Sequence, residues 1–591
     1  MDRMNGLKRT HYCNDVREDL IGQEVVVCGW AAKRRNLGQL VFIDLRDRTG
    51  IVQLAFGDET ARDVFEKAET VRSEFVLMAK GTVKERSSKN PDLPTGNVEV
   101  AVTDLRILGK SETPPFEIVD DCNTSELTRL KYRYLDLRRP ELQRNILLRH
   151  KLAKVTRDYF DENGFIEIET PMLIKSTPEG ARDFLVPSRL HNGEFYALPQ
   201  SPQLYKQLSM VAGFDRYMQI ARCFRDEDLR ADRQPEFSQI DLEMSFVEME
   251  DVLGLVEGYI RRAFKDVLGV DIPLPLPRLT YQDAMERYGS DKPDTRYGME
   301  IYDISDLVKD SGFGVFEGPV QGGGSVRAIT AKGGSAAVSK KGIKKLTEEA
   351  KGIGAKGLAW IRVDEEVSAS FDKFVTEELI ESVIERGGAE QGDLILIIGD
   401  TNTKHVLSIL GALRQTMAKK LDLIPEGLFN LLWIVEMPFF EFDEELGEWV
   451  AMHHPFTAPM DECLEYLESD KGSVRAQSYD LVLNGIELSS GSIRITNPEL
   501  QSRIFSLLGL SEEEAQLKFG YLLDAFRFGP PPHGGMGIGL DRLVMQMLGA
   551  ESLRDVIAYP KLKDATEAMT ECPSPVDEEQ LKLLGLSIDK Q

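Results

Sequence analysis

The first 108 residues alternate apolar and polar side chains in short runs, a pattern typical of β-strands that bury one face. The runs lie at 23–31, 38–46, 50–56, 75–85 and 97–108, and residues 59–74 have the period of a helix instead. Three strands, a helix and two strands follow the order of a five-stranded OB-fold barrel, which commonly binds oligonucleotides. A small β domain of another kind is the alternative that the pattern leaves open.

The pattern changes after a proline-rich, acidic linker at 111–121. Residues 133–164 carry apolar side chains at helical spacing, and Asn163-Gly164 makes a suitable helix end. The run "FIEIET" then predicts a strand, which Pro171 stops. From about 290 to 420 segments such as "KGGSAAVSKKG" are rich in Gly and Lys, which indicates an inserted α+β module.

Length and composition narrow the class of protein. At 591 residues the chain is too long for one hydrophobic core, so several domains are expected. The longest aliphatic run is "LILII" at 394–398, too short for a membrane-spanning helix, and the start "MDRMNGLKRTHYC" has no apolar signal core. The six cysteines form no CxxC pair, which argues against a structural zinc. We therefore expect a cytoplasmic protein with no membrane partner.

The net charge of −26, from 72 Lys and Arg against 98 Asp and Glu, argues against a non-specific nucleic-acid binder. The expected barrel differs from the chain as a whole, because basic residues outnumber acidic ones on part of it. Its first three strands carry a basic set against two aspartates, namely Lys33, Arg34, Arg35, Arg46 and Arg48 against Asp44 and Asp47. Trp30 and Phe42 lie among them, and cations beside aromatic rings suit the stacking of single-stranded bases.

Residues 223–243, "CFRDEDLRADRQPEFSQIDLE", crowd acids and arginines together and then alternate. A solvated charged face is the ordinary explanation. However, Pro235 prevents one continuous helix, and the arginines occur at several phases. A strand, a charged loop and a returning strand fit better, with arginines directed at a phosphate group.

Two further segments carry candidate chemistry. "GGMGIGLDRL" at 534–543 predicts a glycine-rich loop that a ligand can approach closely, with Arg542 at a helix start, although tight strand–helix packing is an equal alternative. Asp480 and Glu487 flank the turn Asn484-Gly485, so in a hairpin they could meet on one face and hold the magnesium of a nucleotide. Solvent-facing acids are the alternative there.

Taken in order, "GFIEIETPML", "FRDED…RQPEFSQIDLE" and "GIGLDR" resemble motifs 1, 2 and 3 of the class II aminoacyl-tRNA synthetases. The segments "LKYRYLDLRRPE", "STPEGARDF", "ALPQSPQLYKQ", "AMHHPFTAP" and "GAKGLAW" are similar to the bacterial-type aspartyl-tRNA synthetases of subclass IIb. The resemblance runs from the barrel to about residue 560.

The resemblance implies a multidomain α/β fold with an N-terminal OB-fold barrel, an antiparallel-sheet catalytic domain and an inserted α+β domain. The implied divisions are 1–108 for the anticodon-binding barrel, 109–135 for a hinge, 136–288 and 421–565 for the two parts of the catalytic domain, 289–420 for the insertion and 566–591 for a C-terminal extension. Motif 1, with Pro171, would form a homodimer interface.

The implied activity is that of an aspartate–tRNA ligase. Aspartate would attack ATP to give aspartyl-adenylate and pyrophosphate, and aspartate would then pass to the terminal adenosine of tRNA-Asp. The implied partners are ATP with Mg²⁺, L-aspartate, tRNA-Asp and a second copy of the chain. A form that also aspartylates tRNA-Asn is the alternative, and Leu37 in the barrel inclines the prediction to the discriminating form.

The family pattern also implies roles for single residues. Arg225 and Arg542 would be catalytic. The implied ATP-binding residues are Arg225, Asp226, Glu227, Phe237, Glu487, Gly539, Leu540, Asp541 and Arg542. The implied aspartate-binding residues are Glu179, Ser201, Gln203, Lys206, Arg225, Gln234, Asp241, His453 and Arg494. Arg35, Phe42 and Gln53 would meet the anticodon, and Asp480 and Glu487 would carry magnesium.

Aspartate and asparagine are nearly isosteric, so a site that separates them must use charge. Lys206 and Arg494, both aimed at the side-chain carboxylate, would be left unpaired by an amide. This pocket and the inserted module argue against a sister enzyme for asparagine or lysine. A catalytically inactive relative would lack Arg225, Arg542 or Glu487, and all three are present.

Overall fold

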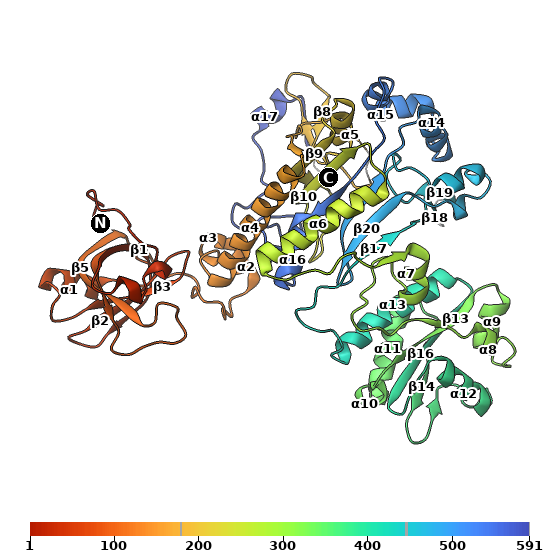
Figure 1. Cartoon of the computed structure of the whole chain (residues 1–591), viewed down its shortest axis with the longest axis horizontal. Helices are drawn as coiled ribbons and strands as arrows, with labels where there is room; N and C mark the ends of the chain where they lie inside the picture. The colour runs from red at the N-terminus through yellow and green to blue at the C-terminus, as the bar shows by residue number, and fades with distance from the viewer. Residues whose placement is uncertain (178–179, 444–446, 590–591) are drawn as a thin grey trace. The chain divides into compact units, whose positions relative to one another are not determined.

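A computed structural model of the chain describes residues 1–177, 180–443 and 447–589 (Figure 1). Contacts between Cα atoms divide the chain into two units. The first unit holds Met1–His150 together with Arg554–Pro575. The second holds Lys151–Leu553 and the residues from Val576 onward.

Five strands of the first unit close into a barrel. They are β1 (Glu24–Asn36), β2 (Val41–Arg46), β3 (Ile51–Phe56), β4 (Val76–Glu85) and β5 (Val98–Gly109), with helix α1 (Arg62–Thr70) between β3 and β4 in the chain. The order around the barrel is β1-β2-β3-β5-β4, and only β3 and β5 run parallel. Alternate residues such as Val25, Val27, Ile43 and Leu45 fill its interior. The predicted OB-fold barrel is confirmed.

Part of the basic set on the barrel serves its own packing. Arg46 is buried and forms an ion pair with Glu74 at 2.7 Å. Arg138, outside the barrel, forms a second ion pair with Glu74 at 2.9 Å and lies over the ring of Trp30 at 4.6 Å. The expected basic and aromatic face is therefore smaller than the sequence suggests, because Arg46 pairs with Glu74 of the barrel domain and Trp30 is covered by Arg138 of the segment that follows it.

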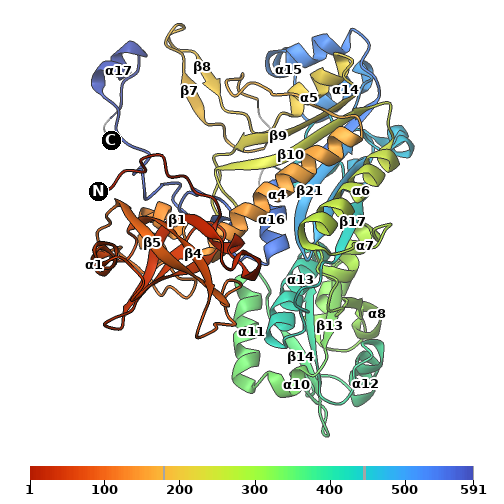
Figure 2. The same cartoon turned by 60° about the vertical axis from the view of Figure 1, so that its left-hand side comes forward.

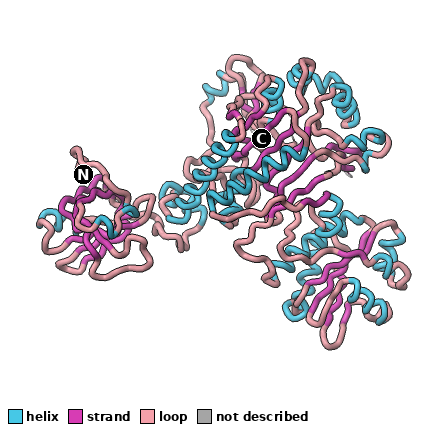
Figure 3. The backbone as a smooth tube through the Cα atoms, in the orientation of Figure 1, coloured by secondary structure: helices cyan, strands magenta, loops and turns pink. Residues whose placement is uncertain are grey.

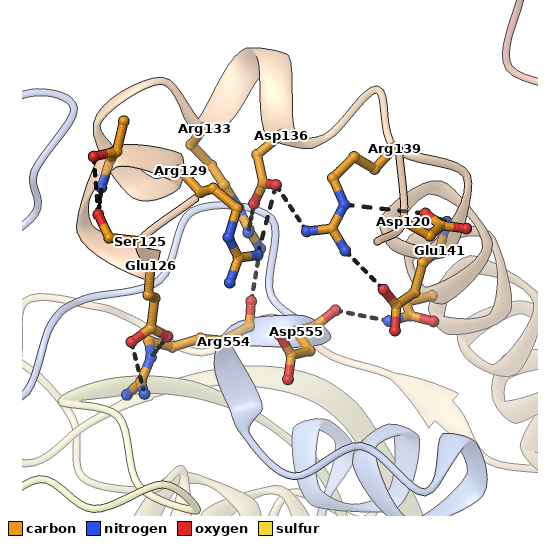
Figure 4. Close-up of polar contacts among 12 residues, drawn as sticks. Asp120, Ser125, Glu126, Arg129, Arg133, Asp136, Arg139, Glu141, Arg554 and Asp555 are labelled. Atoms are coloured by element: carbon orange, nitrogen blue, oxygen red, sulfur yellow. Dashed lines mark hydrogen bonds and ion pairs between the residues drawn. The ribbon is translucent and has the colours of Figure 1, made fainter. Parts of the chain in front are cut away.

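That segment forms a buried polar cluster with the C-terminal end of the unit (Figure 4). It comprises α2 (Glu126–Lys131), α3 (Arg133–Asp136) and the start of α4 (Pro140–Glu162). The Arg133 guanidinium donates to the carbonyls of Arg554, Ile557 and Ala558 at 2.6, 2.9 and 2.9 Å. It also pairs with Asp136 at 2.7 Å. These bonds fix residues 554–558 to the hinge, whereas the predicted division at 565 stays a prediction.

The second unit is built on an eight-stranded sheet (Figure 2). Its strands are β6 (Ile166–Glu167), β9 (Arg216–Phe224), β10 (Glu236–Ser245), β11 (Arg278–Thr280), β17 (Leu431–Val435), β20 (Ser478–Leu483), β21 (Ile486–Ile493) and β22 (His533–Gly539). Their order is β11-β17-β20-β21-β22-β10-β9-β6, antiparallel except for the two edge pairs. The expected antiparallel-sheet catalytic fold is confirmed.

Helices pack on this sheet. They include α5 (Gln203–Val211), α6 (Met249–Leu268) and α16 (Leu540–Leu548). In both Figure 1 and Figure 2 α6 lies beside the C-terminal half of α4. The two helices meet through Phe160 and Tyr259, whose ring centroids are 5.2 Å apart, and Thr156 hydrogen-bonds the Tyr259 hydroxyl at 2.9 Å. As expected, α4 ends just before Asn163-Gly164, where Gly164 has φ +78°.

The inserted module has a sheet of its own, which Figure 3 separates from the larger one. Its order is β12 (Tyr302–Asp303), β13 (Ser325–Ala331), β16 (Asp393–Asp400), β14 (Ala359–Val363) and β15 (Ser368–Ala369). The aliphatic run on β16 is buried on both faces. Leu394, Leu396 and Ile398 pack against α11 (Lys340–Gly352) and α13 (Thr403–Lys420). Ile395 and Ile397 pack against α8 (Ser305–Val308), α9 (Gly314–Gln321) and α12 (Glu377–Arg386).

The remaining elements are short. They are β7 (Leu185–Pro187), β8 (Phe195–Ala197), α7 (Tyr281–Tyr288), α10 (Gly334–Ala337), β18 (Phe440–Asp443), β19 (Glu448–Ala451), α14 (Pro498–Leu507), α15 (Glu512–Phe526) and α17 (Glu578–Leu583). Within the described residues no helix is long and apolar enough to cross a membrane.

Candidate active site

Strands β10, β21 and β22 lie next to one another in the second unit and form the floor of a cavity of about 300 Å³. Side chains alternate along a strand, so Phe237, Gln239 and Asp241 of β10 project to the same side and line this cavity. Helix α5, the start of α16 and the loop after β19 supply the other walls.

The glycine-rich segment forms the middle of the floor. It is strand β22 and not the loop that the sequence predicts, although Arg542 does lie in the first turn of α16 as expected. Gly537 pairs with Asp241 of β10, and a Cβ atom on Gly537 would lie 3.2 Å from Asp241 Oδ1 and 3.1 Å from Gln239 Nε2. A Cβ atom on Gly535 would collide with the Glu243 carboxylate. The glycines therefore make room for polar side chains of the neighbouring strand.

Four buried charges form one network beneath the cavity. Lys206 Nζ lies 3.0 Å from Asp241 Oδ1 and 3.5 Å from Glu243 Oε2. Arg494 Nε and Nη2 donate to the two Glu243 oxygens at 2.9 and 3.1 Å. The side chains of Lys206, Asp241, Glu243 and Arg494 are each at most 2% exposed. A bidentate arginine pair of this kind is a strong, directional contact.

The network differs from the sequence-based expectation in one respect. Lys206 and Arg494 already share Glu243 as a counter-ion, so an uncharged ligand would not leave them unpaired. Burial acts to raise the pKa of Glu243, but the charges of Arg494 and Lys206 outweigh it and hold the pKa below its usual value. For Asp241 burial prevails over Lys206 and raises the pKa.

Two adjacent histidines close one side of the cavity. His453 and His454 lie in the loop after β19, and both line the cavity instead of pointing opposite ways as they would in a strand. Burial lowers the pKa of His453 to about 4. Burial and the neighbouring Arg494 charge lower the pKa of His454 as well. Both rings are therefore neutral at pH 7.

Several buried polar atoms around the cavity have no hydrogen-bond partner among the residues that the structure describes. Arg494 Nη1 donates to His454 Nε2 at 2.7 Å, so the proton of this neutral ring is on Nδ1. That Nδ1 has no acceptor, Gln203 Nε2 has none either, and Asp241 Oδ2 has no donor. Unsatisfied groups of this kind are costly unless a ligand or water meets them. Together they offer donors for a carboxylate and an acceptor for an ammonium group.

The charged segment at 223–243 forms part of the rim of the cavity. Strand β9 ends at Phe224, the charged loop follows, and β10 returns from Glu236, as predicted. The Arg225 guanidinium lies 5.1 Å from the centroid of Phe237 and lines the cavity. Glu227 forms an ion pair with Arg233 at 3.3 Å.

Arg542 forms another part of the rim. Its Nη1 donates to the Glu487 carbonyl at 3.1 Å, and its Nη2 lies 3.5 Å from Asp232 Oδ2. The neighbouring Asp541 is buried and accepts the backbone N–H of Ser238 at 2.8 Å, which ties α16 to strand β10. Arg225 and Arg542 thus line one cavity from two different elements.

Asp480 and Glu487 come from the β20–β21 hairpin, whose turn contains Asn484 and Gly485 as predicted. Burial first, and then the Glu487 charge, raise the pKa of Asp480 to about 8. Asp480 Oδ1 is buried without a partner. Across residues 1–177, 180–443 and 447–589, no group of three or more His, Cys, Asp or Glu side chains could hold a metal ion. Two carboxylates with an unpartnered oxygen fit a cation whose other ligands come from a nucleotide.

A second candidate site lies on the barrel of the first unit. Arg35 lies opposite Phe42 on the neighbouring strand, with the guanidinium 5.8 Å from the ring centroid. Arg35 also donates to Gln53 Oε1 at 2.9 Å, and Gln53 Nε2 donates to Glu99 at 2.6 Å. Arg35 therefore contacts both of the other predicted anticodon residues, and Glu99, which the sequence did not single out, orients Gln53.

The structure brings most of the predicted residues together. Those lining the cavity are Ser201, Gln203, Lys206, Arg225, Glu227, Gln234, Phe237, Asp241, His453, Glu487, Arg494, Gly539, Asp541 and Arg542. Three predicted residues do not line it: Asp226 bonds Arg182, and Leu540 and Asp480 are buried. Glu179 lies outside the described residues. Sequence reasoning missed Glu243 and His454, although both stand in segments that it singled out.

The family of class II tRNA synthetases (D, K and N) matches residues 125–563, and the OB-fold nucleic acid binding domain family matches residues 25–108. The chain therefore belongs to the class II tRNA synthetases of the D, K and N group.

Individual relatives show which members of this family the chain resembles. The chain is 56% identical over 594 residues to an "Aspartate--tRNA ligase" of Ruminiclostridium cellulolyticum, with all of both chains covered. It is also 56% identical over 591 residues to an "Aspartate--tRNA(Asp/Asn) ligase" of Caldanaerobacter subterraneus subsp. tengcongensis, again with full coverage. Among solved structures, asparaginyl-tRNA synthetase from Pyrococcus horikoshii has a TM-score of 0.59 at 18% identity, covering 94% of this chain and 98% of that one. That likeness concerns the fold alone.

Proposed function

We propose that the chain is an aspartate–tRNA ligase, which activates L-aspartate with ATP and transfers it to tRNA-Asp. The observation that carries the proposal is the cavity above the Lys206–Asp241–Glu243–Arg494 network, with unpartnered donors and an unpartnered acceptor suited to an amino acid. Full-length identity of 56% to a relative named aspartate–tRNA ligase supports the choice of amino acid.

In the first step the α-carboxylate of aspartate attacks the α-phosphorus of ATP, and pyrophosphate leaves. The carboxylate is already ionised at neutral pH, so the protein has to supply alignment and positive charge. Arg225 would bind the α-phosphate, and Phe237 beneath it would stack on the adenine, with Arg542 on the other side. The half-buried position of Arg225 over Phe237 supports this assignment.

The aspartate side chain would meet Arg494 and Lys206. These groups donate hydrogen bonds and accept none, so they satisfy both oxygens of a carboxylate but only the carbonyl oxygen of an amide. Glu243 keeps the two cations in place before the ligand arrives. The ammonium group of the ligand would face Asp241 Oδ2, and Ser201, Gln203 and Gln234 would complete this side.

Magnesium enters with ATP as part of the substrate. Asp480 and Glu487 would hold it, because the unpartnered oxygen of Asp480 and the nearby Glu487 carboxylate form an acidic pair. The ion would neutralise phosphate charge while the pyrophosphate leaves.

The barrel would read the anticodon through Phe42, Arg35 and Gln53, since a half-exposed ring under a guanidinium suits base stacking. A homodimer through motif 1 is part of the proposal, and the exposed Ile166 and Leu173 within that motif suit a protein interface. Because tRNA and ATP are its substrates, we place the protein in the cytoplasm.

The decisive experiment is aspartate-dependent exchange between ATP and pyrophosphate. Arg225→Ala should lower the exchange rate about 100- to 1,000-fold, the typical effect of removing one preorganised donor at a reacting oxyanion. Arg230→Ala, an exposed arginine of the same loop, is the matched control and should stay within about twofold. Exchange by Arg225→Ala close to that of the wild type would remove Arg225 from the site.

Charging of both tRNA-Asp and tRNA-Asn is the second candidate. It is favoured by the relative named for both tRNAs, which is as similar as the relative named for aspartate alone. Leu37, exposed at the barrel edge, inclines our proposal to tRNA-Asp alone. Aminoacylation of purified tRNA-Asp and tRNA-Asn side by side separates the two forms.

A further inference from the structure

The inserted module exposes a group of lysines on an otherwise acidic chain. Residues 332–347 contain five lysines and no acidic residue, whereas the whole chain carries a net charge of −26. Such a local reversal of charge can attract an anionic partner, because long-range attraction depends on where charges gather and not only on their sum.

Helix α11 presents most of these lysines on one side. Ile343, Leu346 and Ala350 pack into the module's core. The opposite, exposed side carries Lys340, Lys341, Lys344 and Lys345. The pairs 340/344 and 341/345 are four residues apart, so the Cα atoms of each pair are about 6 Å apart along the helix axis.

Two further lysines belong to this basic region. Lys332 is exposed in the turn after β13, eight residues before Lys340 in the chain. Lys420, at the end of α13, has its Nζ 3.4 Å from the place that a Cβ on Gly342 would take, which puts it beside the first turn of α11. We define the lysine face by its members, Lys332, Lys340, Lys341, Lys344, Lys345 and Lys420.

Acidic partners are concentrated at the other end of the helix. Lys345 pairs with Glu349 at 3.7 Å, and Lys351 pairs with Glu348 at 3.2 Å. In the part of the chain that the structure describes, no ion pair joins Lys332, Lys340, Lys341, Lys344 or Lys420 to an acid. Like charges four residues apart destabilise a helix by a few tenths of a kcal/mol.

The backbone beneath the lysine face is held firmly. Arg362 donates to the carbonyls of Ser335 and Val338, which fixes the turn that leads into α11. The hydroxyl of Ser339 caps the helix by accepting the Gly342 N–H at 3.2 Å. The helix N-terminus adds partial positive charge at the same end. The lysine stems are flexible, but the surface that carries them is defined.

We propose that the lysine face binds the phosphate backbone of the tRNA substrate, as a contact separate from the barrel. This inference rests on the proposed function, because the family to which the chain belongs acts on tRNA. Lysines are point charges on flexible stems, so they suit phosphates and carry no base specificity. The face therefore adds affinity and salt dependence to tRNA binding without entering the adenylate chemistry.

The test compares two triple variants of the full-length chain. The first is Lys340→Gln/Lys341→Gln/Lys344→Gln. The control is Lys309→Gln/Lys373→Gln/Lys404→Gln, which removes the same charge from exposed positions of the same module away from the lysine face. Fluorescence anisotropy gives the Kd for tRNA-Asp at several salt concentrations, and pyrophosphate exchange without tRNA reports on the adenylate site.

The first variant should raise the Kd about tenfold or more at low salt, and the slope of log Kd against log salt should fall by about 2, since each lost phosphate contact removes roughly 0.7 to 0.9. Its exchange rate and Tm should equal those of the wild type, and the control variant should bind within about twofold. An unchanged Kd and salt slope in the first variant would overturn the proposal.

Two further outcomes distinguish tRNA binding by the lysine face from protein binding there, and from the proposed function of the chain. Binding of poly-glutamate that is lost in the first variant, with tRNA binding unchanged, would make the lysine face a protein-binding site and overturn the proposal. If the wild type shows no aspartate-dependent exchange, the proposed function fails. The tRNA affinities of the two variants still decide the role of the lysine face in that case.

Discussion

Glu243 is fully buried between Lys206 and Arg494 and receives two hydrogen bonds from the Arg494 guanidinium. Its neighbour Asp241 could be picked out by family resemblance, but nothing local distinguishes Glu243 from any strand acid. Arg494 lies 251 residues further along the chain, so the pairing appears only when β10 and the end of β21 are brought together. The Glu243 carboxylate therefore positions both cations of the pocket before a ligand binds.

Glu243→Gln should therefore cost the catalytic unit about 3–5 kcal/mol, the usual effect of removing one partner from a buried ion pair. Chemical denaturation of the full chain measures the loss. Glu236→Gln, at the start of the same strand and paired with Arg222 near the surface, is the control and should cost at most about 1 kcal/mol. Equal losses of unfolding free energy in both variants would show that the buried network stabilises the unit no more than a surface ion pair does.

Asp480 gives stability a dependence on pH. Its pKa in the folded chain is about 8, above the ordinary value of 3.8, so the fold prefers the protonated form. This contribution is complete below about pH 3.8 and is lost as the pH rises through 8. Asp480→Asn has no proton to lose. From pH 5 to 8 the variant should gain more than about 1 kcal/mol of unfolding free energy relative to the wild type.

Thermal and chemical unfolding across this pH range test the prediction. Asp461→Asn, at an exposed position of the same unit, should follow the wild-type curve. Parallel curves for Asp480→Asn and the wild type would show that Asp480 is ionised in the folded chain at neutral pH. Magnesium with ATP should stabilise the wild type more than Asp480→Asn, which keeps the proposed ATP contacts but loses one of the two proposed magnesium ligands.

Among the helices and strands, the sequence predicts those whose apolar residues recur at a regular local spacing. The barrel strands follow from alternation, and the end of α4 follows from Asn163-Gly164. Strand β22 is missed because its alternating glycines carry no hydrophobic signal, and their purpose is visible only across to β10. The four charges of the pocket come from α5, β10 and the end of β21, and no spacing within one segment relates them.

Strand β22 offers a test at this scale. Gly535→Ala would place a methyl group against the Leu242 carbonyl and the Glu243 carboxylate, so β10 and β22 must move apart or Glu243 must leave Arg494. The variant should lose both thermal stability and pyrophosphate exchange. Gly254→Ala in α6 meets nothing within 4 Å and should gain up to about 1 kcal/mol. A fully active Gly535→Ala would contradict the packing described for the floor of the cavity.

For the whole molecule, the division into units does not follow the order of the chain. The first unit joins the first 150 residues to a segment near the other end. No sequence pattern predicts this, because Arg133 and its carbonyl acceptors are 421 to 425 residues apart. The barrel itself is independent of that segment, since its core lies within residues 13–107.

The hydrogen bond between Arg133 and the Ala558 carbonyl can form only late in synthesis of the chain. A ribosome that adds about 5–20 residues per second needs roughly 20 to 85 s to pass from the guanidinium to the carbonyl that it binds, 425 residues later. The barrel can close early in that interval, because its interior is complete by residue 107. During the wait Arg133 has Asp136 as its partner but none of its three carbonyl acceptors. The hinge is therefore among the last parts of the nascent chain to acquire its final bonds, although it is among the first to be made.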